Sequence, residues 1–229
     1  ANLEKAFNAL ATDFPIILKP DKGERGKEVT LIEGFDELIA KVNTSRYNSL
    51  LLQSYCNYPN EAGILFYRYP NQKKGKISSI TTKEFCVLIG DGQSSWEALL
   101  RNNIRVKHRL EDLLKRDTIN WQAIAPRGIH QLIEPIGSHN LGTKFMDGNH
   151  LNSIELEERI NQWADQLPGF YYGRFDVKFK DWKSLLAGES FSLMEINGVN
   201  AEPTHIYDPS FSLIKAYRDI FSHMKIIYE

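Results

Sequence analysis

Long apolar runs, cysteines and an excess of either charge are all scarce in this chain of 229 residues. No stretch reaches the roughly eighteen consecutive apolar residues that a membrane-spanning helix needs, and no secretory signal peptide is visible. Lysine and arginine total 28 against 29 acidic residues, so the net charge of −1 gives no electrostatic basis for binding nucleic acid or an anionic membrane. We therefore expect a cytoplasmic protein without nucleic-acid or membrane partners.

Motifs for covalent or zinc chemistry are also lacking. Cys56 and Cys86 are too few for a disulfide framework and form no CxxC motif, so we expect two reduced, buried thiols. The six histidines show no HExxH or other metal spacing. No Ser-His-Asp or Cys-His signature of a nucleophile appears. The phosphate-loop patterns GxxxxGK[ST] and GxGxxG are absent as well.

Hydrophobic periodicity predicts an α+β fold with a largely antiparallel sheet. Helical spacing marks residues 3–11, 35–42, 94–116, 154–167 and 210–224. Strand-like runs cover residues 14–20, 29–34, 49–56, 61–70, 74–92, 130–137, 173–180 and 191–203. No linker is long enough to separate independent domains, but a hinge near residues 51–56 would divide a small lobe, 1–54, from a larger one, 55–229.

Charged residues interrupt two of the apolar strands, "GRFDVKFK" and "FSLMEINGVN". Alternate residues of a strand share a face, so Arg174 and Asp176 should point the same way. In the second strand, Glu195 and Asn197 should share a face, opposite Met194. Burying charge is costly without partners, which means that these groups need an explanation.

If the two strands pair, then Asp176, Glu195 and Asn197 converge. Two carboxylates and an amide carbonyl are hard oxygen ligands, a set that binds Mg²⁺ and leaves positions open for phosphate oxygens. Arg174 beside them would neutralise charge on a phosphoryl group. The alternative is a salt bridge on a solvated sheet face, joining Arg174 to Asp176 or to Glu195.

A second candidate phosphate element is the stretch "ILKPDKGERGKEV" near the start of the chain. Lys19 ends a predicted strand as a fixed cation, and Gly23 and Gly26 would let backbone N–H groups approach phosphates closely. Taken alone, the same stretch favours a plain solvated turn.

The order of these pieces resembles the ATP-grasp superfamily over nearly the whole chain: a strand ending in Lys-Pro, then Gly-x-x-Gly, "QSY" with Glu61, and finally "RFD" and "MEIN". "GDGQSSWEALL" and "SHNLGTKFMD" look like segments of its carboxylate–amine ligase branch, such as cyanophycin synthetase. "GRFD" and "LMEINGV" are similar to the corresponding strands of D-alanine–D-alanine ligases. The resemblance implies two α+β subdomains that grip a nucleotide between largely antiparallel sheets.

The resemblance also implies roles for individual residues. Lys19 would contact the α- and β-phosphates, and Lys83 would be a second, catalytic phosphate-binding lysine. Glu61 would take the ribose hydroxyls, and Arg174 would stabilise the phosphoryl or tetrahedral species. The alternatives are a solvent-facing turn residue for Glu61 and an exposed strand lysine for Lys83.

The remaining implied residues fall into three groups. A phosphate lid would contain Asp21, Gly23, Arg25 and Gly26. The adenine would lie against Gln53, Ser54 and Tyr55, although many members have an acidic residue at the position of Gln53 or Ser54. One or two Mg²⁺ ions, or Mn²⁺, would be held by Asp176, Glu195 and Asn197.

By this resemblance the chain uses ATP and Mg²⁺ to convert a carboxylate into an acylphosphate, which an amine then attacks to form a C–N bond. The expected substrates are a small carboxylate and an amine, such as an amino acid or peptide. The alternatives are a nucleotide-binding module with little catalysis and a small-molecule kinase. Loop residues His139, Glu202 and His205 are either substrate contacts or ordinary structural residues.

The family usually carries a preceding α/β domain, and we expect that domain to be absent from these 229 residues, either because they are a fragment or because the domain is on another chain. We therefore expect residues 1–229 alone to bind nucleotide but to turn over poorly. The oligomeric state and the identity of the substrates stay open.

Overall fold

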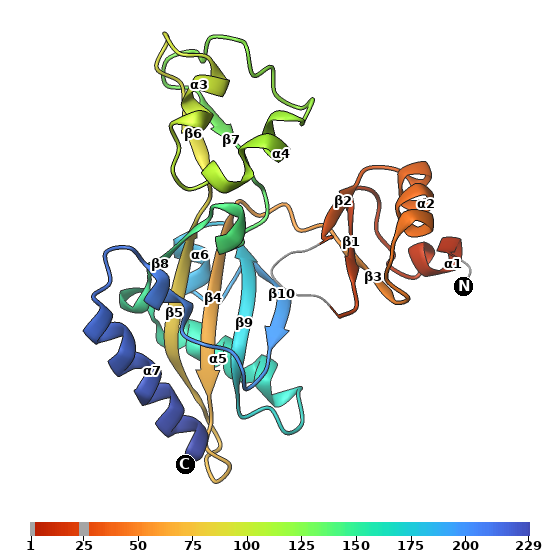
Figure 1. Cartoon of the computed structure of the whole chain (residues 1–229). Helices are drawn as coiled ribbons and strands as arrows, with labels where there is room; N and C mark the ends of the chain where they lie inside the picture. The colour runs from red at the N-terminus through yellow and green to blue at the C-terminus, as the bar shows by residue number, and fades with distance from the viewer. Residues whose placement is uncertain (1–2, 23–27) are drawn as a thin grey trace. The chain divides into compact units, whose positions relative to one another are not determined.

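The computed structural model describes residues 3–22 and 28–229, which form two compact units, Ala1–Asn57 and Tyr58–Glu229. Gly23, Arg25 and Gly26 of the predicted phosphate lid lie outside the described residues. Each unit is described by itself (Figure 1).

The first unit is a small three-stranded antiparallel sheet with helices on one face. Its elements are α1 (Leu3–Asn8), β1 (Ile16–Pro20), β2 (Thr30–Ile32), α2 (Phe35–Thr44) and β3 (Leu50–Ser54). Ile16 and Leu18 of β1 join Ile32 and Leu38 in the core, because alternate strand residues face the helices. The opposite face carries Lys19.

The second unit is built on a five-stranded sheet of order β10-β9-β4-β5-β8, in which every neighbouring pair is antiparallel. Its strands are β4 (Asn60–Tyr67), β5 (Lys76–Glu84), β8 (Lys144–Asp147), β9 (Tyr172–Phe179) and β10 (Phe191–Asn197). One face packs against α5 (Ile154–Asp165) and α6 (Trp182–Leu186), as Figure 1 shows. The predicted α+β fold with antiparallel sheets is confirmed.

The segment between β5 and β8 forms a separate small hydrophobic core. It contains β6 (Val87–Ile89), α3 (Trp96–Arg101), α4 (Leu110–Leu114) and β7 (His130–Leu132). The prediction of one helix over residues 94–116 is wrong. Its start is right, since Ser95 caps α3 by accepting from the Ala98 N–H. The break follows from Asn103, whose side-chain oxygen accepts from the Arg105 N–H and so competes with helical hydrogen bonding.

The last helix, α7 (Leu213–Tyr228), packs with its faces reversed. Its buried residues are Ala216 and the polar His223. Most of its large apolar side chains are exposed instead, while Ile220 and Ile226 are half-buried. The exposed ones are Leu213, Ile214, Tyr217, Phe221, Met224, Ile227 and Tyr228. Hydrogen bonds from its polar residues, rather than apolar burial, therefore hold much of α7 to the sheet.

Cys86 is buried, Cys56 is half-buried, and both are free thiols, so only the reduced state and the burial of Cys86 match the prediction. Across the described residues, no helix is both long enough and apolar enough to cross a membrane.

Candidate functional site

The face of the large sheet that points away from α5 is polar where β4, β5, β9 and β10 meet. In β9, Phe175, Val177 and Phe179 are buried in the core, so the alternating residues between them take the other face. Those residues are Arg174, Asp176 and Lys178. The predicted alternation in this strand is confirmed.

A β-bulge at Met194 turns Glu195 and Asn197 of β10 toward this polar face. Before the bulge Leu193 pairs with Val177, and after it Glu195 pairs with Asp176. Regular pairing would have placed Glu195 on the core side, because it is two residues after Leu193. Sequence reasoning put Met194 on the face opposite Glu195, whereas the structure makes it the extra residue of the bulge.

Asp176 lies at the centre of the polar face. Its Oδ1 accepts from Arg174 Nε at 2.7 Å, and its Oδ2 accepts from Arg174 Nη2 at 3.1 Å and from Asn197 Nδ2 at 3.1 Å. The alternative expected a salt bridge between Arg174 and Asp176, and that salt bridge is present, but it is mostly buried rather than solvated, because the two side chains are 17% and 13% exposed. Gly63, opposite Asp176 in β4, makes the room: a Cβ there would stand 3.0 Å from Arg174 Cδ.

Arg174 stays charged in this setting. Burial opposes the charged guanidinium, but the hydrogen bond and charge of Asp176, together with the charges of Glu195 and Glu202, outweigh burial and raise the pKa of Arg174. A cation is therefore fixed beside two carboxylates at neutral pH.

The residues present fit a hard divalent cation. Among the described residues there is no cluster of three or more His, Cys, Asp or Glu side chains placed to hold a metal. The set here is two carboxylates and an amide oxygen, from Asp176, Glu195 and Asn197, which suits Mg²⁺ with positions left for phosphate. A carboxylate has about four lone pairs, and three hydrogen bonds already occupy most of those of Asp176. Asp176 could therefore bind a metal through both oxygens only if Arg174 moved.

A second charged group lies one strand away, around Glu61 of β4. Lys83 Nζ of β5 lies 3.1 Å from Glu61 Oε2, and Lys178 Nζ of β9 lies 3.6 Å from Oε1. All three side chains are at most 14% exposed. Glu61 is therefore not a solvent-facing turn residue, and Lys83 is not an exposed strand lysine.

Two residues near this group escaped sequence reasoning. Lys178 was not predicted as a site residue, although alternation in β9 puts it on the same face as Arg174 and Asp176. Gly137 allows its loop to approach, since a Cβ there would stand 2.0 Å from Glu61 Oε2. An isolated glycine is a usable signal of close approach, and it applied to Gly63 too.

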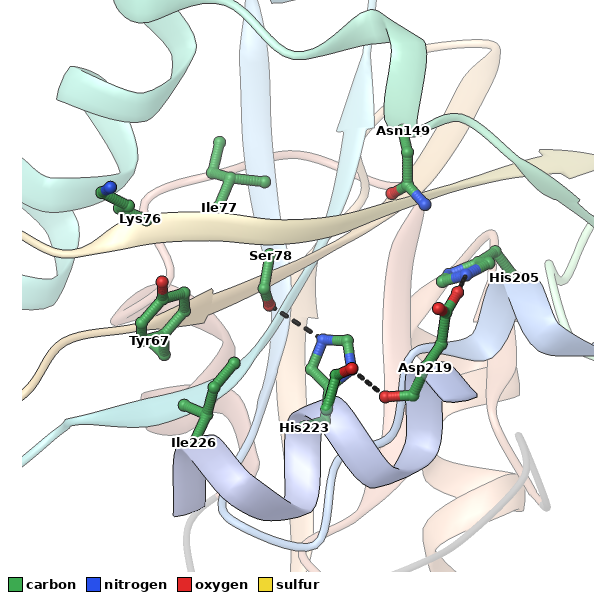
Figure 2. A pocket seen from close by; sticks show the side chains of 10 residues that line it. Tyr67, Lys76, Ile77, Ser78, Asn149, His205, Asp219, His223 and Ile226 are labelled. Atoms are coloured by element: carbon green, nitrogen blue, oxygen red, sulfur yellow. Dashed lines mark hydrogen bonds and ion pairs between the residues drawn. The ribbon is translucent and has the colours of Figure 1, made fainter. Parts of the chain in front are cut away.

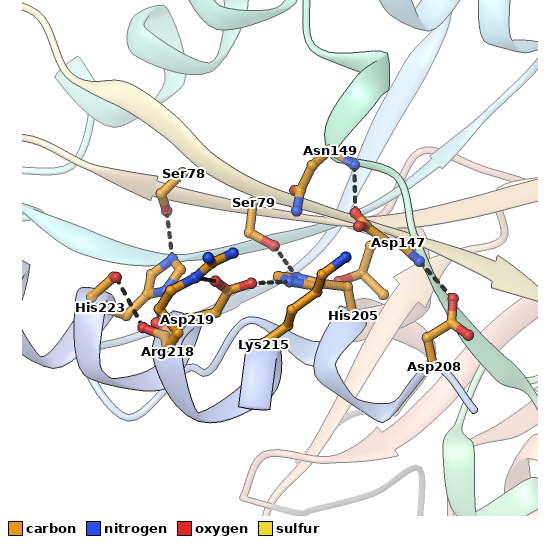
Figure 3. Close-up of polar contacts among 12 residues, drawn as sticks. Ser78, Ser79, Asp147, Asn149, His205, Asp208, Lys215, Arg218, Asp219 and His223 are labelled. Atoms are coloured by element: carbon orange, nitrogen blue, oxygen red, sulfur yellow. Dashed lines mark hydrogen bonds and ion pairs between the residues drawn. The ribbon is translucent and has the colours of Figure 1, made fainter. Parts of the chain in front are cut away.

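His205 is not a substrate contact, because its ring is buried at 1% exposure. Ser79 Oγ lies 2.7 Å from its Nδ1, and Asp219 Oδ2 lies 3.0 Å from its Nε2, as Figure 3 shows. The order Ser-His-Asp imitates a hydrolase triad, but Ser79 is only 2% exposed and no substrate can reach it. The array is structural: it joins β5 to α7.

A cavity of about 420 Å³ lies between β5 and α7 (Figure 2). His223 borders it, with Nε2 3.1 Å from Ser78 Oγ and Nδ1 2.8 Å from the Asp219 carbonyl. Since a carbonyl only accepts, Nδ1–H donates and Nε2 of the neutral ring accepts from Ser78. Groups that hold α7 line much of the cavity, and of the residues considered for the site only His205 borders it.

The other predicted nucleotide residues belong to the first unit. Lys19 pairs with Leu51 across β1 and β3, and Gln53 pairs with Ile17, so Lys19 and Gln53 share the face away from the helices. Ser54 ends β3 on the other face, and Tyr55 follows it. Asp21 is exposed, and its carboxylate accepts from Ser49 Oγ at 3.3 Å.

No family model and no curated protein matches this sequence. Solved structures do match. They include a bifunctional glutathione synthetase from Pasteurella multocida (14% identity, TM-score 0.48), the VanG D-Ala:D-Ser ligase from Enterococcus faecalis (11%, 0.49) and the D-alanine–D-alanine ligase from Bacillus anthracis (17%, 0.45).

These matches cover 97–100% of this chain, but the chain spans 32% of the glutathione synthetase and 53% and 56% of the two ligases. All three are ATP-grasp enzymes, the superfamily that the sequence resembles. At these identities and TM-scores the likeness assigns no residue role, so the chemistry below rests on the side chains of this chain.

Proposed function

We propose that this chain is the nucleotide-binding part of an Mg²⁺-dependent ligase that activates a carboxylate as an acylphosphate for attack by an amine. The observation that carries the proposal is the convergence of Asp176, Glu195, Asn197 and Arg174 on one sheet face. A fixed cation next to hard oxygen ligands is the arrangement that binding of a metal–triphosphate requires.

Asp176, Glu195 and Asn197 would hold Mg²⁺, which when bound neutralises phosphate charge. Arg174 would bind the transferring phosphoryl group, and Lys83, beside Glu61, would bind a further phosphate oxygen. The substrate carboxylate attacks the terminal phosphorus and ADP leaves; the amine then attacks the acyl carbon and phosphate leaves. No protein nucleophile is required, because positioning and electrostatics supply most of the catalysis.

In the first unit, Lys19, Asp21, Gln53, Ser54, Tyr55 and the lid residues stay predicted contacts of the same nucleotide. Two groups on the second unit support a ligase or kinase over a passive module. Asp176, Glu195 and Asn197, the proposed metal ligands, lie at neighbouring positions of β9 and β10. The mostly buried Lys83 lies 3.1 Å from Glu61. Use of ATP also favours a cytoplasmic location.

The test is ADP release by the full-length protein with ATP, Mg²⁺ and a panel of amino acids and peptides, followed by product analysis. ADP with a new amide supports the ligase. ADP with a stable phosphoester would replace it with the kinase, and nucleotide binding without ADP would replace it with the binding module.

A further inference from the structure

The segment after β10 folds back beside the polar face and carries a fixed carboxylate. Within it, the 3-10 helix η4 (Thr204–Tyr207) is anchored by Thr204 Oγ1, 3.1 Å from Thr81 Oγ1 on β5. The anchored helix presents Tyr207, whose hydroxyl donates to Glu202 Oε1 at 2.5 Å. Both Glu202 and Tyr207 are exposed, so Glu202 is an oriented carboxylate open to a ligand.

Glu202 is adjacent to the proposed phosphoryl-binding group. Arg174 Nη1 donates to the Glu202 backbone carbonyl at 3.4 Å. In the part of the chain that the structure describes, no lysine, arginine or histidine forms an ion pair with the Glu202 carboxylate. The charge of Arg174 reaches Glu202 without forming an ion pair with its carboxylate. An oriented carboxylate without an ion-pair partner in the described residues can receive one from a substrate.

Aromatic rings continue from Tyr207 to the second charged group of the site. The His139 ring lies 5.7 Å from the Tyr207 ring and 5.6 Å from the Phe145 ring. Lys83 Nζ in turn lies 5.6 Å from the centre of Phe145. A continuous series of contacts thus runs from Arg174 through these rings to Lys83. Aromatic faces attract cations and exclude water, so this wall suits an ammonium group.

We propose that Glu202, oriented by Tyr207, binds the ammonium group of the amine substrate, which is an amino acid or a peptide N-terminus. The proposal rests on the proposed ligase function and deepens it. The amine would bind to Glu202, whose backbone carbonyl accepts a hydrogen bond from Arg174, the residue proposed to bind the phosphoryl group. Glu202 is assigned recognition of the amine and no role in phosphoryl transfer.

The test measures KM for the amine in the full chain, using the panel of amino acids and dipeptides, with hydroxylamine as a second nucleophile. Hydroxylamine is largely uncharged near neutral pH and needs no ammonium site. Because loss of a charge-assisted hydrogen bond costs about a tenfold change in affinity or more, Glu202→Gln should raise KM for the amine at least about tenfold. Tyr207→Phe should raise it less.

Hydroxylamine-dependent ADP release should stay near the wild-type rate in Glu202→Gln, which separates amine binding from misfolding or loss of phosphoryl transfer. Glu111→Gln, an exposed acid on α4, is the matched control and should change neither value. An unchanged KM for the amine in an active Glu202→Gln protein overturns the subsite alone. Absence of ADP from wild type with every nucleophile overturns the ligase function and the subsite with it.

Discussion

Glu195 stands directly across from Asp176 in the antiparallel ladder of β10 and β9, although the two carboxylates differ in surroundings. Asp176 is enclosed by Arg174 and Asn197, while Glu195 is exposed. A metal site here would thus combine one carboxylate that also stabilises the fold with one that does not. Substitutions at the two positions should separate these roles.

Asp176→Asn and Glu195→Gln should each weaken Mg²⁺-dependent binding of a non-hydrolysable ATP analogue by at least about tenfold, since even outer-shell partners of a metal carry that much. Asp176→Asn should also destabilise the fold by about 1–3 kcal/mol, because it leaves the mostly buried Arg174 beside a neutral group. Glu195→Gln should change stability by no more than about 0.5 kcal/mol. Calorimetric titration and urea unfolding measure the two effects. Unaltered metal dependence in both variants would show that the metal assignment is wrong.

Gly63→Ala should weaken binding of the same analogue without unfolding the protein. The new Cβ would stand 3.0 Å from Arg174 Cδ and 3.2 Å from Asp176 Oδ1, so the arginine must leave its rotamer. An off-rotamer side chain costs about 0.5–1.5 kcal/mol, which corresponds to roughly two- to tenfold weaker binding. Gly63→Val should be worse. Gly34→Ala is the control, because no atom lies within 4 Å of its added Cβ. Wild-type affinity in a folded Gly63→Val protein would contradict the close packing.

Protonation of His223 should destabilise the second unit. Burial lowers the pKa of His223 below its ordinary 6.5, with the neighbouring His205 charge acting in the same direction against the opposing effect of Asp219. The unfolded chain therefore binds the proton more readily, so this stability is complete above about pH 6.5 and is lost as pH falls through the folded pKa. In the wild type the free energy of unfolding should fall between pH 7.5 and pH 5.5, about one unit on either side of the ordinary histidine pKa. In His223→Gln this fall should be smaller. The exposed His150→Gln should keep the wild-type slope, and an identical slope in His223→Gln would refute the assignment.

His205→Ala should lower the free energy of unfolding by about 1–3 kcal/mol, because it leaves the buried Ser79 hydroxyl and the Asp219 carboxylate without their shared partner. Ser79→Ala should cost less, since one neutral hydrogen bond is lost. Urea unfolding measures both. A serine-reactive fluorophosphonate should not label Ser79; labelling would mean that this array is accessible and reactive rather than structural.

Part of the site followed from periodicity, because β9 alternates regularly between the core and the polar face. The bulge did not, although the sequence held its signal. Phe191, Leu193, Glu195 and Asn197 all have the same parity, so two apolar and two polar residues would share one face of a regular strand. Only an extra residue resolves that conflict, and the structure places it at Met194.

Other features depend on tertiary contacts that spacing does not encode. The burial of His205 requires Ser79, which lies 126 residues away in the sequence, and Asp219 on the following helix. The break after α3 came from one side chain, Asn103, in a stretch whose apolar pattern favoured continuous helix. Strand alternation made Arg174, Asp176 and Lys178 predictable as residues of one face. The approach of the Gly137 loop to Glu61 is a tertiary contact that alternation does not give.

The reversed faces of α7 invert the usual relation between hydrophobicity and tolerance to mutation. In most surface helices the apolar positions are constrained and the polar ones vary freely. Here Asp219 and His223 make the specific contacts, while Ile214 and Phe221 are 84% and 65% exposed. In a saturation mutagenesis scan of this helix, substitutions of Asp219 and His223 should be tolerated poorly, as in a core. Substitutions of the exposed large apolar residues should be tolerated well, as on a surface.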